Sequence, residues 1–327
     1  MAQLTRRQAT AGLSGLVASP FVARTAWAEA YPAGLTIKIV VPYPAGGATD
    51  IVGRIVGDRL GALWGVTTVV ENVPGAGANI GIDRVAKGPA DGTQILIVPP
   101  NLTTNPFLYA KVPYDGEKDI LTLAQVASVP NLLVVKKDLP VNSVAELIAY
   151  AKANPGKLNF ASSGVGSTIH LSGELFKRMT GIEMVHVAYR GSASAVNDLL
   201  GGSVDLMFDN ISSIIGHARA GSVKALGITT AKRSSIAPEY VPVAETVPGY
   251  DTTSWFGVGV RAGTPPEIAD KIETDVRQLC REKIVQERLG GLVADTIGSS
   301  RQEFTAYVKS ERERWGKLIV DLKLRTE

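Results

Sequence analysis

Short apolar runs alternate with helical stretches along most of the 327-residue chain, and this alternation limits the folds that the chain can adopt. Apolar runs separated by helices are typical of βαβ units in a parallel sheet. One hydrophobic core rarely grows beyond about 250–300 residues, so the chain is expected to divide into two lobes. The sequence therefore predicts an α/β protein in which each lobe is a mainly parallel sheet flanked by helices. The runs are Thr36–Val41, Thr67–Glu71 and Gln94–Val98, followed by four that begin at Leu132, Leu158, Met184 and Val204.

The lobe boundaries are predicted from the places where the chain crosses between the two series of runs. No flexible or low-complexity linker separates the series, so the lobes are expected to be joined by strands within 124–135 and 223–260. Residues 29–126 together with 229–327 are predicted to form the first lobe, and residues 127–228 the second. Ligands of open parallel sheets bind outside the carboxyl ends of the strands, so a ligand site is expected in the cleft between the lobes.

The first 28 residues have the pattern of a signal peptide. A basic start at 1–7 precedes a mildly apolar stretch, and A-W-A at 26–28 forms a cleavage site of the A-x-A type. Arg6-Arg7 resembles a twin-arginine signal, but the usual Phe-Leu-Lys continuation is missing, so export by the twin-arginine (Tat) and general secretory (Sec) routes both stay open. The mature protein is expected to be exported and soluble.

Composition excludes several classes of function. The formal net charge of +3 arises from three arginines within 1–28, and the remaining chain has 31 basic and 31 acidic residues. A neutral chain lacks the basic character of a nucleic-acid binder, and no run of about 18 apolar residues follows the signal. The one cysteine, Cys280, excludes an internal disulfide and a cysteine-rich metal site. No cofactor, metal or nucleic-acid partner is expected, and the protein is expected to be a monomer.

Helix boundaries are marked by capping sequences. Ser143, Thr264 and Ser300 are each followed three residues later by Glu, which is the pattern of a capping box. Glycines at 156, 181 and 221 sit where helices are expected to stop. From Thr264 onward the chain has the pattern of a helix, a short strand and a helix.

Residues 40–50, V-V-P-Y-P-A-G-G-A-T-D, join the first apolar run to a helix that Thr49 or Asp50 is predicted to cap. Gly46 and Gly47 permit backbone conformations closed to other residues and let a ligand approach the main chain. The helix N-terminus offers unpaired N–H groups and the positive end of the helix dipole. An anion can bind there without an arginine or lysine. Taken alone, however, the loop favours the alternative of an ordinary strand–turn–helix connection.

Residues 159–173, N-F-A-S-S-G-V-G-S-T-I-H-L-S-G, repeat this arrangement. Ser167 or Thr168 is predicted to cap a helix that continues to Thr180, and several hydroxyl and N–H groups converge before it. Two helix N-termini aimed into one cleft are predicted to hold a carboxylate from both sides. Plain turns are the alternative for this pair of loops as well.

Three further side chains follow later strands. Tyr189 and Arg190 come after the run that begins at Met184. Tyr189 is predicted to form part of the cleft wall, and Arg190 is predicted to pair with a second anionic group. A packed tyrosine and a surface arginine are the alternative. Asp209 is predicted to accept a hydrogen bond from a ligand or a bound water, or to cap a helix. The glycines at 75–81 are spaced one residue too far apart for a dinucleotide fingerprint and are interpreted as a turn into the helix 79–87.

Ser167 and His170 lie one helical turn apart, which suggests a nucleophile and its base. No G-x-S-x-G elbow is present, and no acidic residue is placed to orient the imidazole. His170 is therefore interpreted as a polar residue of the helix turn or a minor ligand contact. An exported Ser/His hydrolase stays the alternative function. His186 and His217 show no metal-ligand spacing and are interpreted as structural.

Together these stretches resemble the substrate-binding receptors of tripartite tricarboxylate transporters, also called the Bug family, from about residue 37 to residue 318. The resemblance implies a two-lobed periplasmic-binding-protein fold of type II. It also implies a non-enzymatic receptor that closes on a small organic carboxylate, such as a di- or tricarboxylate or an aromatic acid, and hands it to membrane permease subunits. A ligand receptor for a sensor kinase is a further alternative. The motifs in the family's order include P-Y-P-A-G-G-A-T-D, V-V-E-N-V-P-G-A-G-A-N-I-G, G-S-T-I-H-L-S-G-E-L-F and L-L-G-G-S-V-D-L-M-F-D-N.

By position, the resemblance implies ligand contacts from both glycine-rich loops and from two later strand ends. Ala188 and Ser194 stand where prolines are common in the family, so the contact of Arg190 with a ligand stays open. The implied ligand-binding residues are Tyr43, Ala45, Gly46, Gly47, Thr49, Asp50, Ser163, Gly164, Gly166, Ser167, Thr168, His170, Tyr189, Arg190 and Asp209.

Overall fold

The computed structural model describes residues 31–325, and the predicted signal peptide lies outside this part of the chain. Strands and helices alternate from the first strand onward, as the apolar runs predict. The strands are β1 (Thr36–Val41), β2 (Thr67–Asn72), β3 (Gln94–Val98), β4 (Ile120–Lys136), β5 (Asn159–Ser162), β6 (Val185–Ala188), β7 (Leu206–Asn210), β8 (Val223–Ile228), β9 (Thr253–Arg261) and β10 (Asp295–Thr296). The helices are α2 (Ala48–Trp64), α3 (Asn79–Ala86), α4 (Asn101–Leu108), α5 (Val144–Ala153), α6 (Thr168–Thr180), α7 (Ser192–Leu200), α8 (Ile211–Arg219), the 3-10 turn η1 (Val243–Glu245), α9 (Pro266–Leu279), α10 (Lys283–Gly290) and α11 (Arg301–Asp321).

In the described residues the strands join through β4 into one sheet of ten strands, and its two halves are here called the first and the second sheet. The predicted α/β architecture is confirmed. In the first sheet β1 pairs in parallel with β2 and β3, and in the second β5 pairs in parallel with β6 and β7. Strand β9 is antiparallel to β3 and β4, and β4 is antiparallel to β7 and β8. Parallel pairing is thus confined to strands joined by helical crossovers, because such a pair needs a long connection.

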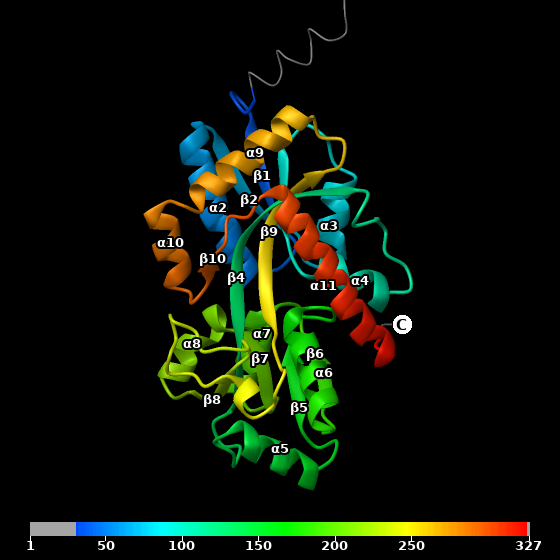
Figure 1. Ribbon diagram of the computed structural model, residues 1–327, viewed down its shortest axis with the longest axis vertical. Coiled ribbons are helices and arrows are strands. Elements are labelled where there is room, and N and C mark those ends of the chain that lie inside the picture. Colours follow the sequence, from blue (N-terminus) through cyan, green and yellow to red (C-terminus); the bar gives the residue numbers. More distant parts are fainter. Residues whose placement is uncertain (1–30, 326–327) are drawn as a thin grey trace, which may run out of the picture. The chain divides into compact units, whose positions relative to one another are not determined.

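Strand β4 belongs to both sheets. Its residues 120–130 pair with β9, whereas residues 131–136 pair with β7 and β8. Figure 1 shows β4 and β9 as two long neighbouring strands. The crossing predicted within 124–135 is therefore one continuous strand. The lobe boundaries stay predictions.

Each sheet has an apolar core of its own. The first core includes Val40, Leu96, Val98, Trp255 and Phe304. The second includes Leu133, Phe160, Phe176, Phe208 and Tyr250. A third, smaller cluster joins α4, α6 and α11, and because α6 packs on the second sheet while α11 packs on α4 and β4, it ties the lobes together. Its buried members are Leu108, Leu171, Trp315, Leu318 and Ile319.

The capping sequences are confirmed at two of the three helices. Ser143 accepts a hydrogen bond from the Glu146 N–H, and Ser300 forms the full capping box with Glu303. The prediction for Thr264 is wrong, because α9 begins at Pro266 and its N-cap is Pro265. A proline at the first helical position leaves no N–H there to satisfy. The Thr264 hydroxyl instead donates to the Arg261 carbonyl at 2.8 Å.

Candidate functional site

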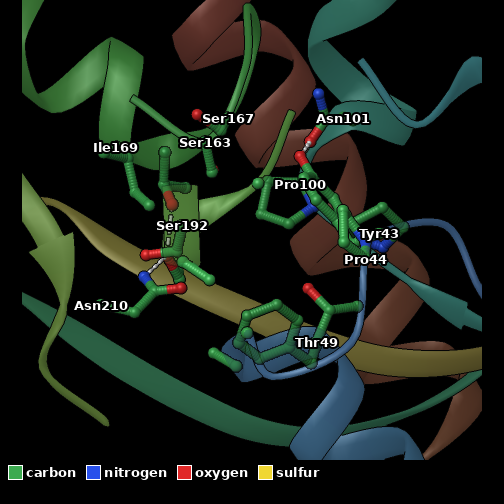
Figure 2. Close-up of a pocket in the computed structure, with 18 of the residues that line it drawn as sticks. Tyr43, Pro44, Thr49, Pro100, Asn101, Ser163, Ser167, Ile169, Ser192 and Asn210 are labelled. Carbon is green, nitrogen blue, oxygen red and sulfur yellow. Dashed lines mark hydrogen bonds between the residues drawn. The ribbon is translucent and has the colours of Figure 1, made fainter. Parts of the chain in front are cut away.

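A small cavity of about 50 Å³, here called the inner cavity, lies between loops from both sheets. Figure 2 shows its lining, with Tyr43, Pro44 and Asn101 facing Ser163, Ser192 and Asn210. A water molecule needs a cavity volume of about 10–15 Å³, so this cavity has room for a few waters. Its lining residues are Tyr43, Pro44, Ala45, Gly47, Ala48, Thr49, Pro99, Pro100, Asn101, Ser163, Ser167, Thr168, Ile169, Arg190, Gly191, Ser192, Ala193, Asn210, Ser254 and Phe256.

Within residues 31–325, five helices begin at the wall of the inner cavity, namely α2, α4, α6, α7 and α8. The first N–H groups of a helix have no partner inside the helix, and the helix dipole adds positive potential at the same end. No acidic side chain lines the cavity in the described part of the chain. The surroundings therefore favour an anion. The five N-cap residues, all on the wall, are Gly47, Pro100, Ser167, Gly191 and Asn210.

The first glycine-rich loop reaches the cavity with its main chain. Gly47 is the N-cap of α2, so the prediction that Thr49 or Asp50 caps this helix is wrong, and both lie within its first turn. Gly46 has a φ of 89°, a left-handed conformation that favours glycine. Gly47 has an extended backbone, and a Cβ built there would meet no atom within 4 Å. A side chain at position 47 would therefore have open space before it at the cavity wall.

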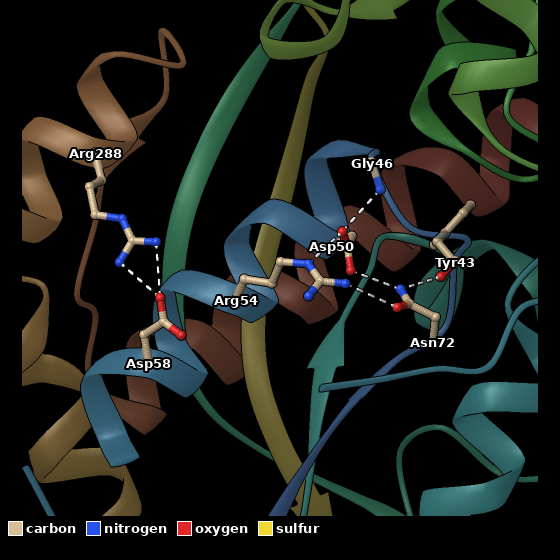
Figure 3. Close-up of polar contacts among 7 residues, drawn as sticks. All are labelled: Tyr43, Gly46, Asp50, Arg54, Asp58, Asn72 and Arg288. Carbon is tan, nitrogen blue, oxygen red and sulfur yellow. Dashed lines mark hydrogen bonds and ion pairs between the residues drawn. The ribbon is translucent and has the colours of Figure 1, made fainter. Parts of the chain in front are cut away.

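Asp50 fixes this loop from behind (Figure 3). Its carboxylate accepts hydrogen bonds of 2.9 Å from the Gly46 N–H, the Arg54 Nε and the Asn72 Nδ2. Burial opposes ionisation, but these bonds, that from Arg54 first, hold the pKa of Asp50 below its usual value. Asn72 also donates to the Tyr43 carbonyl at 3.0 Å. The ionised side chain thus holds the loop in place.

The second glycine-rich loop is ordered by the cap that the sequence predicts. Ser167 Oγ accepts from the His170 N–H at 3.2 Å and donates to the Gly164 carbonyl at 2.7 Å. Gly166 has a φ of 81°, and a Cβ there would lie 2.8 Å from Asn105 Oδ1. Thr104 Oγ1 donates to the Gly166 carbonyl at 2.9 Å. The loop is therefore packed tightly against α4 of the other lobe.

A hydrogen-bonded group of side chains follows the wall on the side of α7 and α8. Ser192 Oγ donates to Asp209 Oδ1 at 2.5 Å, and the Asn210 N–H donates to the same oxygen at 2.9 Å. The other carboxyl oxygen, Oδ2, is buried without a hydrogen-bond partner. Asp209 is fully buried, and burial raises its pKa to about 7. Asp209 thus lies behind the wall and orients Ser192, which lines the cavity.

His170 does not act on the Ser167 hydroxyl in this structure. Its Nδ1 accepts from the Gly166 N–H at 3.3 Å, and its ring stacks on His186 with centroids 4.0 Å apart. Burial, with a further contribution from His186, lowers the pKa of His170 well below its usual value. His186 is also held neutral by burial, which lowers its pKa to about 4. The pair is a stack of a buried and a half-buried imidazole, and this geometry gives no support to a hydrolase.

Tyr189 and Arg190 differ in their freedom. The Tyr189 hydroxyl donates to Asp198 Oδ2 at 2.6 Å, so its proton is already engaged. Arg190 lines the inner cavity, is exposed, and has no ion-pair partner among the described residues. Its guanidinium is thus free to meet an acidic group of a ligand.

The structure places eight of the fifteen predicted ligand-binding residues on the wall of the inner cavity. They are Tyr43, Ala45, Gly47, Thr49, Ser163, Ser167, Thr168 and Arg190. The remaining seven do not line it: Gly46, Asp50, Gly164, Gly166, His170, Tyr189 and Asp209. For all fifteen residues a ligand contact stays a prediction. Sequence reasoning missed the walls formed by α4, α7, α8 and β9. The sequence pointed to the start of α8, because its N-cap Asn210 directly follows Asp209, a predicted ligand-binding residue.

In the described part of the chain, every helix is too short or too polar to span a membrane. Nor does the part at 31–325 contain a group of three or more side chains suited to holding a metal ion.

Comparison with known proteins gives a consistent set of similarities. The model of the "Tripartite tricarboxylate transporter family receptor" family matches residues 52–324. The "UPF0065 protein in tcbD-tcbE intergenic region" of Pseudomonas sp. (strain P51) is 37% identical over 326 residues, 99% of this chain and 96% of that protein. Protein BugT of Bordetella pertussis is 33% identical over 319 residues, 97% of each chain. A solved structure of an R. palustris protein with adipate has a TM-score of 0.86 and 40% identity, and the match covers 88% of this chain and 97% of that one.

Proposed function

Because the chain belongs to the family of tripartite tricarboxylate transporter receptors, we propose that it binds the acid group of a small organic carboxylate in the inner cavity and delivers the ligand to the membrane subunits of such a transporter. Residues 1–28 direct its export, so that capture takes place in the periplasm. The protein acts by binding alone, without a cofactor.

The convergence of five helix N-termini on one small cavity carries this proposal. Main-chain N–H groups from both lobes and the Ser163 hydroxyl supply donors, and no acidic side chain of the described residues opposes them at the wall. A carboxylate accepts several such hydrogen bonds at once. The R. palustris relative, solved with adipate, supports an organic acid as the class of ligand.

Gly47→Val tests the proposal. A valine side chain extends from the cavity wall into open space, so we expect adipate binding to be abolished while the protein stays folded. Calorimetric titration measures the binding, and circular dichroism checks the fold.

Gly290→Val is the matched control, because Gly290 also has open space before its Cβ and does not line the inner cavity. Binding of adipate to folded Gly47→Val with parental affinity would place the ligand elsewhere.

Delivery to a permease is tested by transport. Vesicles that contain the membrane subunits of a tripartite tricarboxylate transporter are expected to take up the bound acid only when the receptor is added. Uptake that is independent of the receptor, together with activation of a sensor kinase by the liganded protein, would favour the signalling alternative.

A further inference from the structure

A second cavity adjoins the inner one and is about ten times larger, at about 530 Å³. We call it the outer cavity. It is formed on one side by residues 42–44 and by the turn 74–80 before and at the start of α3, and on the other by Ser163, Gly164 and residues 189–191. Its volume falls within the range of about 300–1,000 Å³ that is usual for small-molecule sites. The inner cavity, in contrast, has room only for an acid group.

The two cavities share a boundary made of Tyr43, Pro44, Ser163, Arg190 and Gly191, which line both. Pro44 packs closely on Gly191, where a Cβ would lie 2.9 Å from the Pro44 Cγ. The structure shows no hydrogen bond between these two residues, so parting them costs only van der Waals contacts, which are individually small. A ligand that occupies both cavities is therefore compatible with this boundary.

The wall of the outer cavity is mainly apolar. Its aliphatic surface comes from Pro42, Pro44, Pro74, Ala76, Ala78 and Ile80. The two tyrosines add rings whose hydroxyls are already engaged, that of Tyr43 with Asn101 at 2.6 Å and that of Tyr189 with Asp198. Among the described residues, only Ser163 and Arg190 then offer free polar side-chain groups to an occupant. A polyhydroxylated or multiply charged body would leave its polar groups without partners there.

We propose that the outer cavity binds the apolar body of the ligand whose carboxylate occupies the inner cavity. The receptor then selects organic acids with an aromatic ring or an alkyl chain of several carbons, and Arg190 is placed to meet a second acid group at the boundary. This inference rests on the proposed function, because it takes the carboxylate in the inner cavity as its starting point.

A series of straight-chain acids from acetate to octanoate tests the inference. Each methylene that enters the outer cavity is expected to raise affinity about fourfold, the factor for fully burying one CH₂ group. Calorimetric titration of the whole protein measures the longer acids, and displacement titration the weaker short ones. Affinity that is independent of chain length, with acetate still bound, would overturn the inference and leave the proposed function intact. If no acid of any length binds, the proposed function fails and this inference fails with it.

Two matched variants locate the effect. Ile80 and Ile284 are each the second residue of an eight-residue helix and are exposed to a similar degree, 53% and 47%, but only Ile80 lines the outer cavity. Ile80→Asn is expected to weaken octanoate binding about five- to tenfold, because part of an apolar contact is lost, and to leave acetate unchanged. Ile284→Asn is expected to bind every acid as the parent does. An unchanged dependence on chain length in Ile80→Asn would contradict the proposed position of the apolar body.

Discussion

The Ser192 hydroxyl shows how one residue behind the wall controls what the inner cavity offers to a ligand. Its single hydrogen is donated to Asp209 Oδ1, so only lone pairs remain for a ligand while Asp209 is ionised. A protonated Asp209 can instead donate to Ser192 and free that hydrogen for a carboxylate. No charged side chain of the described residues contacts Asp209 through a hydrogen bond or ion pair, so its own ionisation sets this balance.

We therefore expect carboxylate affinity to fall as the pH rises through about 7, the value to which burial raises the pKa of Asp209. Between pH 6 and pH 8 the loss is at most about tenfold, which follows from linkage to one proton. Asp209→Asn keeps the neutral form at every pH, so its affinity is expected to be constant over this range. Calorimetric titration at both pH values measures the effect.

Unfolding provides an independent control for the same variant. A carboxyl whose folded pKa is raised binds more protons in the folded than in the unfolded protein, so its contribution to stability is lost as the pH rises from about 4 to about 7. Asp209→Asn is therefore expected to gain stability relative to the parent at pH 8 compared with pH 5. An equal pH dependence of binding in parent and variant would rule out Asp209 as the titrating group.

Single residues also show where the sequence was sufficient. The Ser167 cap was predictable because its partners lie within three residues, and the closeness of Gly47 to the cavity follows from a local strand–turn–helix pattern. Asp50 was predicted to contact the ligand, but the structure shows it hydrogen-bonded to Asn72 of β2. Asn72 lies 22 residues away in the sequence, so a local pattern does not reveal this partner. Asn101 and Ser192 lie on the wall of the inner cavity because strand ends that are distant in the sequence come together in the fold. A local sequence pattern does not predict such long-range contacts.

At the scale of elements, helix α2 carries two carboxylates with different tasks, and Figure 3 shows both. Asp50 in its first turn fixes the glycine-rich loop, whereas Asp58 pairs with Arg288 of α10 at 3.1 Å. Exposed pairs of the second kind contribute little to stability, about 0–1 kcal/mol. The buried hydrogen bonds of Asp50 order a segment that would otherwise lose entropy on binding.

Asp50→Ala and Asn72→Ala are both expected to weaken carboxylate binding about fivefold, since each releases the loop at 43–47. Asp58→Ala is the control on the same helix and is expected to bind as the parent does. Calorimetric titration of the three variants compares them. If Asn72→Ala kept full affinity while Asp50→Ala lost it, Asp50 would be a direct ligand contact. The proposed role of Asp50 in holding the loop would then be wrong.

The fold was predictable from the alternation of elements, but the pairing of β4 was not. Apolar runs reveal strands without revealing their partners. The sequence predicts a run from Leu132 and a crossing strand within 124–135, whereas β4 begins at Ile120 and pairs first with β9. The change of partner at Pro130 and Asn131 depends on strands that come more than 70 residues later in the chain. This pairing is therefore a property of the assembled sheet.

At the scale of the whole molecule, several contacts already join the two lobes. Thr104 bonds to Gly166, Arg178 pairs with Asp321 at 3.2 Å, and the cluster at Trp315 packs between α4, α6 and α11. A ligand held by loops of both lobes binds the folded chain and has no site in the unfolded one.

A bound carboxylate is therefore expected to stabilise the protein by about 2.7 kcal/mol at a hundredfold excess over its Kd. For a chain of this size the melting temperature should rise by roughly 5 °C. A thermal-shift screen of organic acids at constant ionic strength measures the rise, with neutral sugars as controls. Stabilisation by a sugar and by no acid would contradict an anion site.

The five helix N-termini also bear on how such a receptor changes over generations. Every residue except proline supplies a main-chain N–H, so the donors that favour an acid persist through most substitutions at the wall. Side chains at the outer cavity, such as Ile80 and Arg190, are free to vary without removing those donors. A lineage of these proteins can thus move from one nutrient to another by single mutations, while each descendant still recognises the same functional group.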